Sequence, residues 1–337
     1  IDNKSLSVYK VRNMVKEVIE RNKELFDKYR YPAKIVELQE KLKRGGFNSQ
    51  SNVIKGEIKA PSTDDIPSLP EKGSDEYNEL NNIGISSIKN NEVGIVILNG
   101  GMATRFGGGV KGLVEVFDGK SFLQLKIENA KAIAKKNNAK VPVFIMNSFQ
   151  SEKLTEDFLI KHNNFGYEHI NSFNQLISVR LDEKGEVFLD ENGYPSFYAP
   201  GHGDFRYAFV NLGMLDKFMQ EGGKYLLFSN GDNLAATLDP AIIGLHIKNG
   251  NEMTIEVAEK DPGDKGGAPA FVDGKLQIVE NFKFPVDFDQ STIPVMNTNS
   301  FVFSAESLKK EIELDWYVAM KDVKGRKVVQ FERLANE

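Results

Sequence analysis

The sequence predicts an α/β protein built around an open, mostly parallel sheet. Three observations support this fold class. Short runs of almost only apolar residues recur from residue 93 onward, and each has the length of a strand that is buried on both faces. Segments with apolar residues at helical spacing lie between several of these runs. Polar, glycine-containing sequence follows several of the runs directly, as it does where sheet strands end at a ligand site.

The N-terminal part has a different character from this sheet. Apolar residues at helical spacing predict an amphipathic helix over residues 7–29. Residues 44–74 are rich in Gly, Ser, Asn, Pro and Asp, which predicts a long irregular connection. We therefore expect an N-terminal helical segment with its linker over residues 1–75 and a main domain over residues 76–337.

The main domain alternates predicted strands and helices. A helix is predicted over residues 122–136, with Ser121 as its N-cap, and another over residues 212–220. Residues 178–198 resemble hairpins with a glycine in each turn. The predicted strands cover residues 93–98, 141–146, 224–229, 253–258 and 300–304.

Composition excludes several classes of function. The 337 residues are 40% hydrophobic and 27% charged, which is ordinary for one large or two modest globular domains. A net charge of -5 does not indicate a generic basic surface for nucleic acid. The absence of cysteine excludes disulfides, thiolate metal sites and a cysteine nucleophile, and four histidines argue against a histidine-rich metal cluster. No apolar run is long enough to span a bilayer and no signal-peptide pattern opens the chain, so we expect a cytoplasmic protein without a membrane partner.

A glycine-rich loop follows the first predicted strand, over residues 98–111. Its glycines let main-chain N–H groups approach phosphate oxygens without a clashing Cβ. Arg105 can form a forked contact with a phosphate, and Lys111 can add a point charge. The alternative is a flexible loop with two solvated cations. The dinucleotide-binding fingerprint does not match, and the Walker A loop does not match because Gly112 follows Lys111 where a hydroxyl residue is needed.

This loop resembles the nucleotide loop of the UDP-sugar pyrophosphorylases, which include UTP–glucose-1-phosphate uridylyltransferase and UDP-N-acetylhexosamine pyrophosphorylase. Six further motifs of the family follow in its order, so that the resemblance covers residues 93 to about 305. These motifs lie at residues 146–149, 172–175, 200–204, 229–236, 264–267 and 297–301.

The resemblance implies a GT-A-like, Rossmann-type core with a mostly parallel mixed sheet that binds UTP and a sugar 1-phosphate together. The sugar phosphate would attack the α-phosphorus of UTP, and magnesium pyrophosphate would leave. Residues 76–337 would be the nucleotidyltransferase catalytic domain. Known members usually continue past the segment that resembles residues 328–334, so a C-terminal domain is expected to be absent or truncated here. The oligomeric state stays open.

The resemblance also assigns charged residues to the chemistry. Asp232 would hold Mg²⁺, the expected cofactor, against the α-phosphate, although a turn aspartate that caps the next segment is the alternative. Lys265 would be the catalytic cation, with Lys111 and Arg105 as further catalytic cations. A solvated loop lysine is the alternative for Lys265, and Lys260 is a nearby rival.

The remaining predicted site residues bind the two substrates. Gln175 would read a base edge, since a carboxamide both donates and accepts hydrogen bonds, and Gly201 would let the backbone approach the base. The full nucleotide-binding set is Leu98, Asn99, Gly100, Gly101, Lys111, Gln175, Gly201 and Asp232. The sugar 1-phosphate would contact His202, Asn230, Gly231, Asn297 and Asn299.

The leading functional hypothesis is a Mg²⁺-dependent uridylyltransferase that acts on glucose 1-phosphate. The same reaction on N-acetylglucosamine or galactose 1-phosphate is the nearest alternative. The motifs at residues 200–204 and 229–233 favour glucose, whereas Arg105 favours the acetylhexosamine branch. A sugar-nucleotide-binding regulator without catalysis is the alternative from another class.

Overall fold

A computed structural model describes residues 14–47, 50–102, 108–261, 263–264 and 266–336. The chain divides into two compact units. The first unit contains residues 1–53, 175–204 and 314–335, and the second contains residues 54–174, 205–313 and 336–337. The expected boundary at residue 75 stays a prediction.

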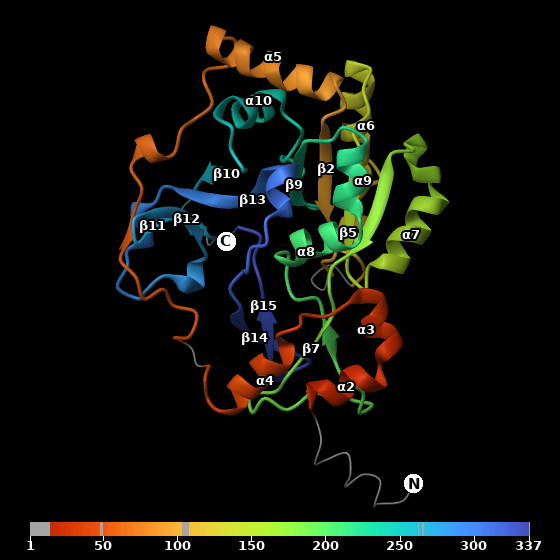
Figure 1. Cartoon of the computed structure of the whole chain (residues 1–337), viewed down its shortest axis with the longest axis vertical. Helices are drawn as coiled ribbons and strands as arrows, with labels where there is room; N and C mark the ends of the chain where they lie inside the picture. The colour runs from red at the N-terminus through yellow and green to blue at the C-terminus, as the bar shows by residue number, and fades with distance from the viewer. Residues whose placement is uncertain (1–13, 48–49, 103–107, 262, 265, 337) are drawn as a thin grey trace, which may run out of the picture. The chain divides into compact units, whose positions relative to one another are not determined.

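The second unit is built on a six-stranded mixed sheet with the order β10–β13–β9–β2–β5–β6 (Figure 1). The four strands β9, β2, β5 and β6 are parallel, whereas β13 runs antiparallel to both of its neighbours. This confirms the predicted α/β class with a mixed sheet. The strands are β2 (Val93–Leu98), β5 (Val143–Asn147), β6 (Ile170–Asn174), β9 (Tyr225–Asn230), β10 (Met253–Glu259) and β13 (Val295–Ser304).

Helices pack on both faces of this sheet. One face carries aliphatic side chains such as Ile95, Val143 and Leu227, which pack against Ile127 and its neighbours on the helices. The opposite face is aromatic, and there Phe144 packs edge-on against Phe209 with ring centroids 4.9 Å apart. The first face is covered by α5 (Asp75–Lys89), α6 (Phe122–Asn137), α7 (Glu152–Lys161) and α10 (Pro240–Asn249), and the second by α8 (Asp204–Asn211) and α9 (Met214–Gln220).

A smaller sheet with its own core completes the second unit. It contains β1 (Ile58–Lys59), β11 (Ala268–Val272) and β12 (Lys275–Val279) in antiparallel order. The stretch expected to be irregular over residues 44–74 thus supplies a short strand, because its backbone pairs with β11. A short hairpin of β3 (Glu115–Phe117) and β4 (Lys120–Ser121) leads into α6, and Ser121 caps that helix as predicted, accepting from the Gln124 N–H at 3.2 Å.

In its described residues, the first unit combines three short helices with two hairpins. The predicted single helix over residues 7–29 is wrong in its described part, where two helices meet at Asn22. The backbone of Asn22 leaves the helical region, with φ −113° and ψ 36°, and its side chain donates to the Val18 carbonyl at 2.8 Å. The elements are α2 (Val15–Arg21), α3 (Lys23–Tyr29), α4 (Ile35–Lys43), β7 (Ser178–Val179), β8 (Phe197–Tyr198), β14 (Tyr317–Val323) and β15 (Arg326–Glu332).

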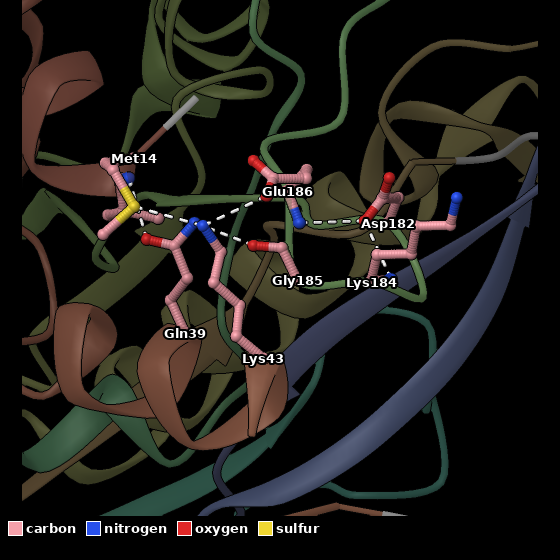
Figure 2. Close-up of polar contacts among 8 residues, drawn as sticks. Met14, Gln39, Lys43, Asp182, Lys184, Gly185 and Glu186 are labelled. Carbon is pink, nitrogen blue, oxygen red and sulfur yellow. Dashed lines mark hydrogen bonds and ion pairs between the residues drawn. The ribbon is translucent and has the colours of Figure 1, made fainter. Parts of the chain in front are cut away.

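Buried polar contacts join α4 to the turn at residues 182–186 (Figure 2). The fully buried side chain of Gln39 accepts from the Val15 N–H at 2.9 Å and donates to the Gly185 carbonyl at 2.8 Å. Lys43 on the same helix forms an ion pair with Glu186 at 3.2 Å. Because a fully buried amide must satisfy its polar atoms, Gln39 fixes this turn against the helix.

No helix in the described part of the chain is both long and apolar enough to cross a membrane.

Candidate functional site

The carboxyl ends of β2 and β9 bring two predicted charged residues together. The strands are parallel, with Leu98 opposite Asn230, and the Gly231 N–H donates to the Leu98 carbonyl at 2.9 Å. Beyond these ends, the ammonium of Lys111 forms an ion pair with the carboxylate of Asp232. Both side chains stay partly exposed, at 44% and 28%, so a ligand can reach the pair.

Asn99 at the start of the glycine loop is held by buried hydrogen bonds. Its side chain is 2% exposed and donates to Asn147 Oδ1 at 2.9 Å and to Thr155 Oγ1 at 2.8 Å. Its main-chain N–H donates to the Met146 carbonyl at 2.8 Å. A Cβ on Gly112 would lie 2.1 Å from Asn99 Oδ1, so only glycine fits there. Since its N–H groups are engaged inside the protein, Asn99 is better suited to holding the loop than to donating to a nucleotide.

Three predicted substrate residues form an asparagine cluster between β9 and β13. The Asn299 side chain donates to Asn230 Oδ1 at 2.8 Å, and its main-chain N–H donates to Asn297 Oδ1 at 3.0 Å. Asn299 has a φ of 56°, in the left-handed region. Its own Oδ1 is buried without a hydrogen-bond partner among the described residues. A buried acceptor in this state suits a ligand hydroxyl or a cation.

The loop at residues 200–204 packs closely on residues 333–335, which belong to the same first unit. Gly201 has a φ of 95°, and a Cβ there would lie 2.5 Å from the Arg333 carbonyl oxygen. His202 Nδ1 accepts from the Ala335 N–H at 3.1 Å. His202 keeps some exposure as a residue, but desolvation of its ring lowers its pKa to about 4, so the ring is neutral near neutral pH. Because Nδ1 accepts, the ring proton is on Nε2.

Asp204 is the buried charge of this loop. The side chain is fully buried and forms an ion pair with Arg333, whose guanidinium lies 4.3 Å from the Trp316 ring centroid. Burial raises the pKa of Asp204 to about 6, although Arg333 and, more weakly, the main-chain N–H of Leu176 oppose that rise. Leu176 directly follows Gln175, which is 7% exposed, so Asp204 connects two of the predicted binding segments.

The comparisons with known proteins identify the family. The model of UTP–glucose-1-phosphate uridylyltransferase (UDPGP) matches residues 46–336. The chain belongs to this family.

The chain is also similar to individual members of the family. It is 29% identical over 322 residues to a UTP–glucose-1-phosphate uridylyltransferase of Hordeum vulgare, covering 90% of this chain and 68% of the relative. It is 32% identical over 259 residues to the same-named protein of Musa acuminata, covering 72% of this chain and 55% of the relative. The matches thus span between about half and two thirds of these relatives.

Solved structures show the same fold. The UDP-N-acetylglucosamine pyrophosphorylase of Trypanosoma brucei, solved with an inhibitor, has a TM-score of 0.78 at 18% identity and covers all of this chain and 75% of its own. The UDP-glucose phosphorylase of the same organism has a TM-score of 0.71 at 23% identity, covering 96% of this chain and 71% of its own. The resemblance inferred from the sequence motifs is therefore confirmed at the level of the family.

Two of the predicted catalytic cations of this UTP–glucose-1-phosphate uridylyltransferase family member cannot be placed in the structure. Arg105 and Lys265 lie outside the described residues. The rival Lys260 is half-buried, its Nζ lies 3.5 Å from the Gln290 carbonyl oxygen, and burial lowers its pKa. Of the other predicted residues, Gln175, Gly201 and His202 belong to the first unit and the rest to the second.

The described residues offer one carboxylate, that of Asp232, as a ligand for magnesium. Among the described residues, no three or more histidine or acidic side chains gather as a metal cage. Mg²⁺ is usually bound by one or two carboxylates together with substrate phosphates and water. The partly exposed side chain of Asp232 fits that pattern, since a phosphate could complete the shell.

The sequence analysis missed Lys126, a charged residue near Asp232, and Glu256, a charged residue near Lys126. Lys126 and Glu256 interact electrostatically, and Lys126 also interacts with Asp232. Glu256 is a half-buried residue of β10 whose pKa is raised by burial. The sequence could have indicated the burial of Lys126. This residue lies three positions after Leu123 and four before Ala130, on the apolar stripe of its helix.

Proposed function

We propose that the chain is a Mg²⁺-dependent uridylyltransferase that forms UDP-glucose and pyrophosphate from UTP and glucose 1-phosphate. The observation that carries this proposal is the Lys111–Asp232 ion pair beyond the carboxyl ends of β2 and β9, inside the part of the chain that matches the family. The GT-A-like, Rossmann-type description of the core, the catalytic domain over residues 76–337 and a cytoplasmic location belong to the same proposal.

The reaction is a displacement between two anions. An oxygen of the sugar phosphate forms a bond to the α-phosphorus of UTP, the bond from that phosphorus to the bridging oxygen breaks, and pyrophosphate leaves. Such a reaction requires in-line positioning and offset of negative charge rather than a covalent nucleophile. Lys111 would offset phosphate charge, and the main chain at Gly100 and Gly101 would contact the phosphates. Arg105 and Lys265 are proposed as further cations.

Asp232 would hold the magnesium ion. When bound, Mg²⁺ supplies charge that neutralises phosphate oxygens and the leaving pyrophosphate. In the described structure the Asp232 carboxylate is paired with Lys111, so the same carboxylate that would face the metal already lies beside a cation that could face phosphate. This neighbouring arrangement supports the assignment of both residues to one phosphate site.

Polar residues would orient the two substrates. Gln175 and Gly201 are proposed to contact the base, and neutral His202 to donate from Nε2 to the sugar phosphate. The buried Oδ1 of Asn299 has no hydrogen-bond partner among the described residues, which favours an interaction with a sugar hydroxyl beside Asn230, Gly231 and Asn297.

A pyrophosphate-release assay tests the proposal. UTP and Mg²⁺ are supplied with glucose, galactose or N-acetylglucosamine 1-phosphate, and we expect the highest kcat/KM with glucose 1-phosphate. A higher value with another sugar would replace the substrate and keep the reaction. Binding of UTP without turnover of any sugar 1-phosphate would instead support the non-catalytic regulator.

A further inference from the structure

Lys126 is a buried cation on the apolar stripe of α6. Its side chain is only 6% exposed, and its neighbours on the same face, Leu123, Ile127 and Ala130, are fully buried. Lysine is almost never buried to this extent without partners. Transfer of an ammonium from water into the interior costs free energy that apolar packing does not return. The position therefore requires specific contacts of the charged end.

Those contacts bracket the segment that carries Asp232. Lys126 Nζ donates to Ser229 Oγ and to the Ala236 carbonyl oxygen, each at 2.8 Å. Ser229 lies at the end of β9 and is fully buried, whereas Ala236 lies beyond the strand in irregular structure. One ammonium thus holds both ends of residues 230–235.

Apart from the Lys111–Asp232 ion pair, the other contacts of this segment are longer or lie at its beginning. The Gly231 N–H donates to Leu98 at 2.9 Å. Asn233 Oδ1 accepts from the N–H groups of Ala235 and Ala236 at 3.1 and 3.2 Å, and Asn233 Nδ2 reaches Ser300 Oγ at 3.3 Å. Lys126 therefore supplies the short charged contact at the far end of the segment.

The charge of Lys126 also acts on the same segment. Burial is the larger influence and lowers the pKa of Lys126 to about 8, while Asp232 and Glu256 oppose it. The ammonium consequently stays mostly protonated near neutral pH. It is a second cation in the surroundings of Asp232, in addition to the Lys111 ammonium.

Building on the proposed uridylyltransferase function, we propose that Lys126 is a positioning residue for the nucleotide site. Its buried ammonium holds residues 230–235 in place through hydrogen bonds to Ser229 and Ala236, and so sets the position of Asp232 for the complex of magnesium with UTP. A lysine that only fills the interior would share the burial and the hydrogen bonds, but its loss would leave nucleotide binding unchanged.

The test compares Lys126→Met with a matched control, Lys131→Met. Lys131 is on the same helix and its Nζ donates to the Phe165 carbonyl at 2.8 Å, so both changes remove one lysine–carbonyl bond. Hydrogen–deuterium exchange of a peptide covering residues 229–236 reports the segment, and calorimetry reports the affinity for UTP with Mg²⁺. For Lys126→Met we expect exchange about tenfold faster and affinity about tenfold weaker, as for loss of a charged hydrogen bond. Neither should change in Lys131→Met.

Three results would overturn the inference. If Lys126→Met exchanges at the wild-type rate in residues 229–236, Lys126 does not hold this segment. If exchange is faster but the affinity for UTP is unchanged, Lys126 does not position the nucleotide site. Equal effects in the Lys131→Met control would do the same. If Lys126→Met does not fold, Lys126→Gln supplies the comparison, because it keeps a neutral donor: weakened UTP affinity is then expected, and normal affinity counts against the inference.

The same measurements separate this inference from the proposed function. If the wild-type protein binds UTP with Mg²⁺ but converts no sugar 1-phosphate, the uridylyltransferase proposal fails, and exchange and affinity still decide the role of Lys126. If the wild-type protein does not bind UTP, both proposals are rejected.

Discussion

The segment after β9 and the loop at residues 200–204 are held by different chemistry. Lys126 anchors the first through two uncharged oxygens, whereas Asp204 anchors the second through the oppositely charged Arg333. When one partner of a buried charge pair is removed, the other stays buried without compensation, which is more costly than loss of a hydrogen bond. We therefore expect changes in the 200–204 loop to act mainly on stability, and changes after β9 mainly on nucleotide binding and turnover.

The largest expected effect is on the chemistry beyond β9. Asp232→Ala removes the proposed metal ligand, and we expect kcat to fall about a thousandfold or more, by analogy with loss of a charge-stabilising group. Steady-state kinetics across a range of Mg²⁺ concentrations measure the change, and urea unfolding should show little loss of stability, since Asp232 is partly exposed. Near-normal kcat at limiting Mg²⁺ would reject the metal assignment.

Arg333→Met tests the charge pair in the other loop. It leaves Asp204 buried without its cation, so the free energy of unfolding should fall by about 3–5 kcal/mol. Urea denaturation measures this loss. The double variant with Asp204→Asn should recover part of it, because the uncompensated charge is gone. Strictly additive losses in the double variant would show that the two side chains do not stabilise each other.

The pH dependence of stability should report Asp204. Its pKa is raised from 3.8 to about 6 in the folded protein, so between those values the folded state binds more protons than the unfolded state. The contribution of Asp204 to stability therefore falls as pH rises through this window, by up to about 3 kcal/mol. His202 acts with the opposite sign, since its pKa is lowered.

Comparison of wild type with Asp204→Asn isolates this contribution, because both proteins keep His202. Unfolding curves at several pH values between about 4 and 7 would measure the difference. A difference that is constant over the range would mean that Asp204 does not titrate there in the folded protein.

The smallest expected effect concerns backbone space in the 200–204 loop. Gly201 and Gly193 both have positive φ, at 95° and 81°, but only at Gly201 would a Cβ meet backbone, 2.5 Å from the Arg333 carbonyl oxygen. Gly193→Ala should cost about 1 kcal/mol of stability from φ alone, and Gly201→Ala about 2–3 kcal/mol. Thermal unfolding of the two variants measures the difference. Equal losses would mean that the loop and residue 333 can move apart at little cost.

Much of the fold could be predicted because its signals are local. The apolar runs that became β2, β5, β9, β10 and β13 are each contained in a few consecutive residues. The strand β6 was missed because its sequence, Ile170–Asn174, is mostly polar and lies at the edge of the sheet. The break at Asn22 was missed because an apolar pattern continues through it, although its torsion angles, φ −113° and ψ 36°, are not helical.

The parts of the site that depend on contacts between residues far apart in the sequence could not be predicted as well. The family motifs indicated Lys111 and Asp232, which the structure brings together. The pairing of Asp204 with Arg333 joins residues far apart in the chain, so no local pattern predicts it. The burial of Lys126 likewise depends on which surface its helix covers.

The contacts of residues 333–335 have a practical consequence for protein production. A shortened chain that ends at Glu332 would lose the counter-charge of Asp204, the donor to His202 Nδ1 and the backbone against which Gly201 and Gly203 are packed. Such a fragment would retain every family motif from the glycine loop onward, yet it should be harder to keep folded, and the proposed contact of His202 with the sugar phosphate should be weakened.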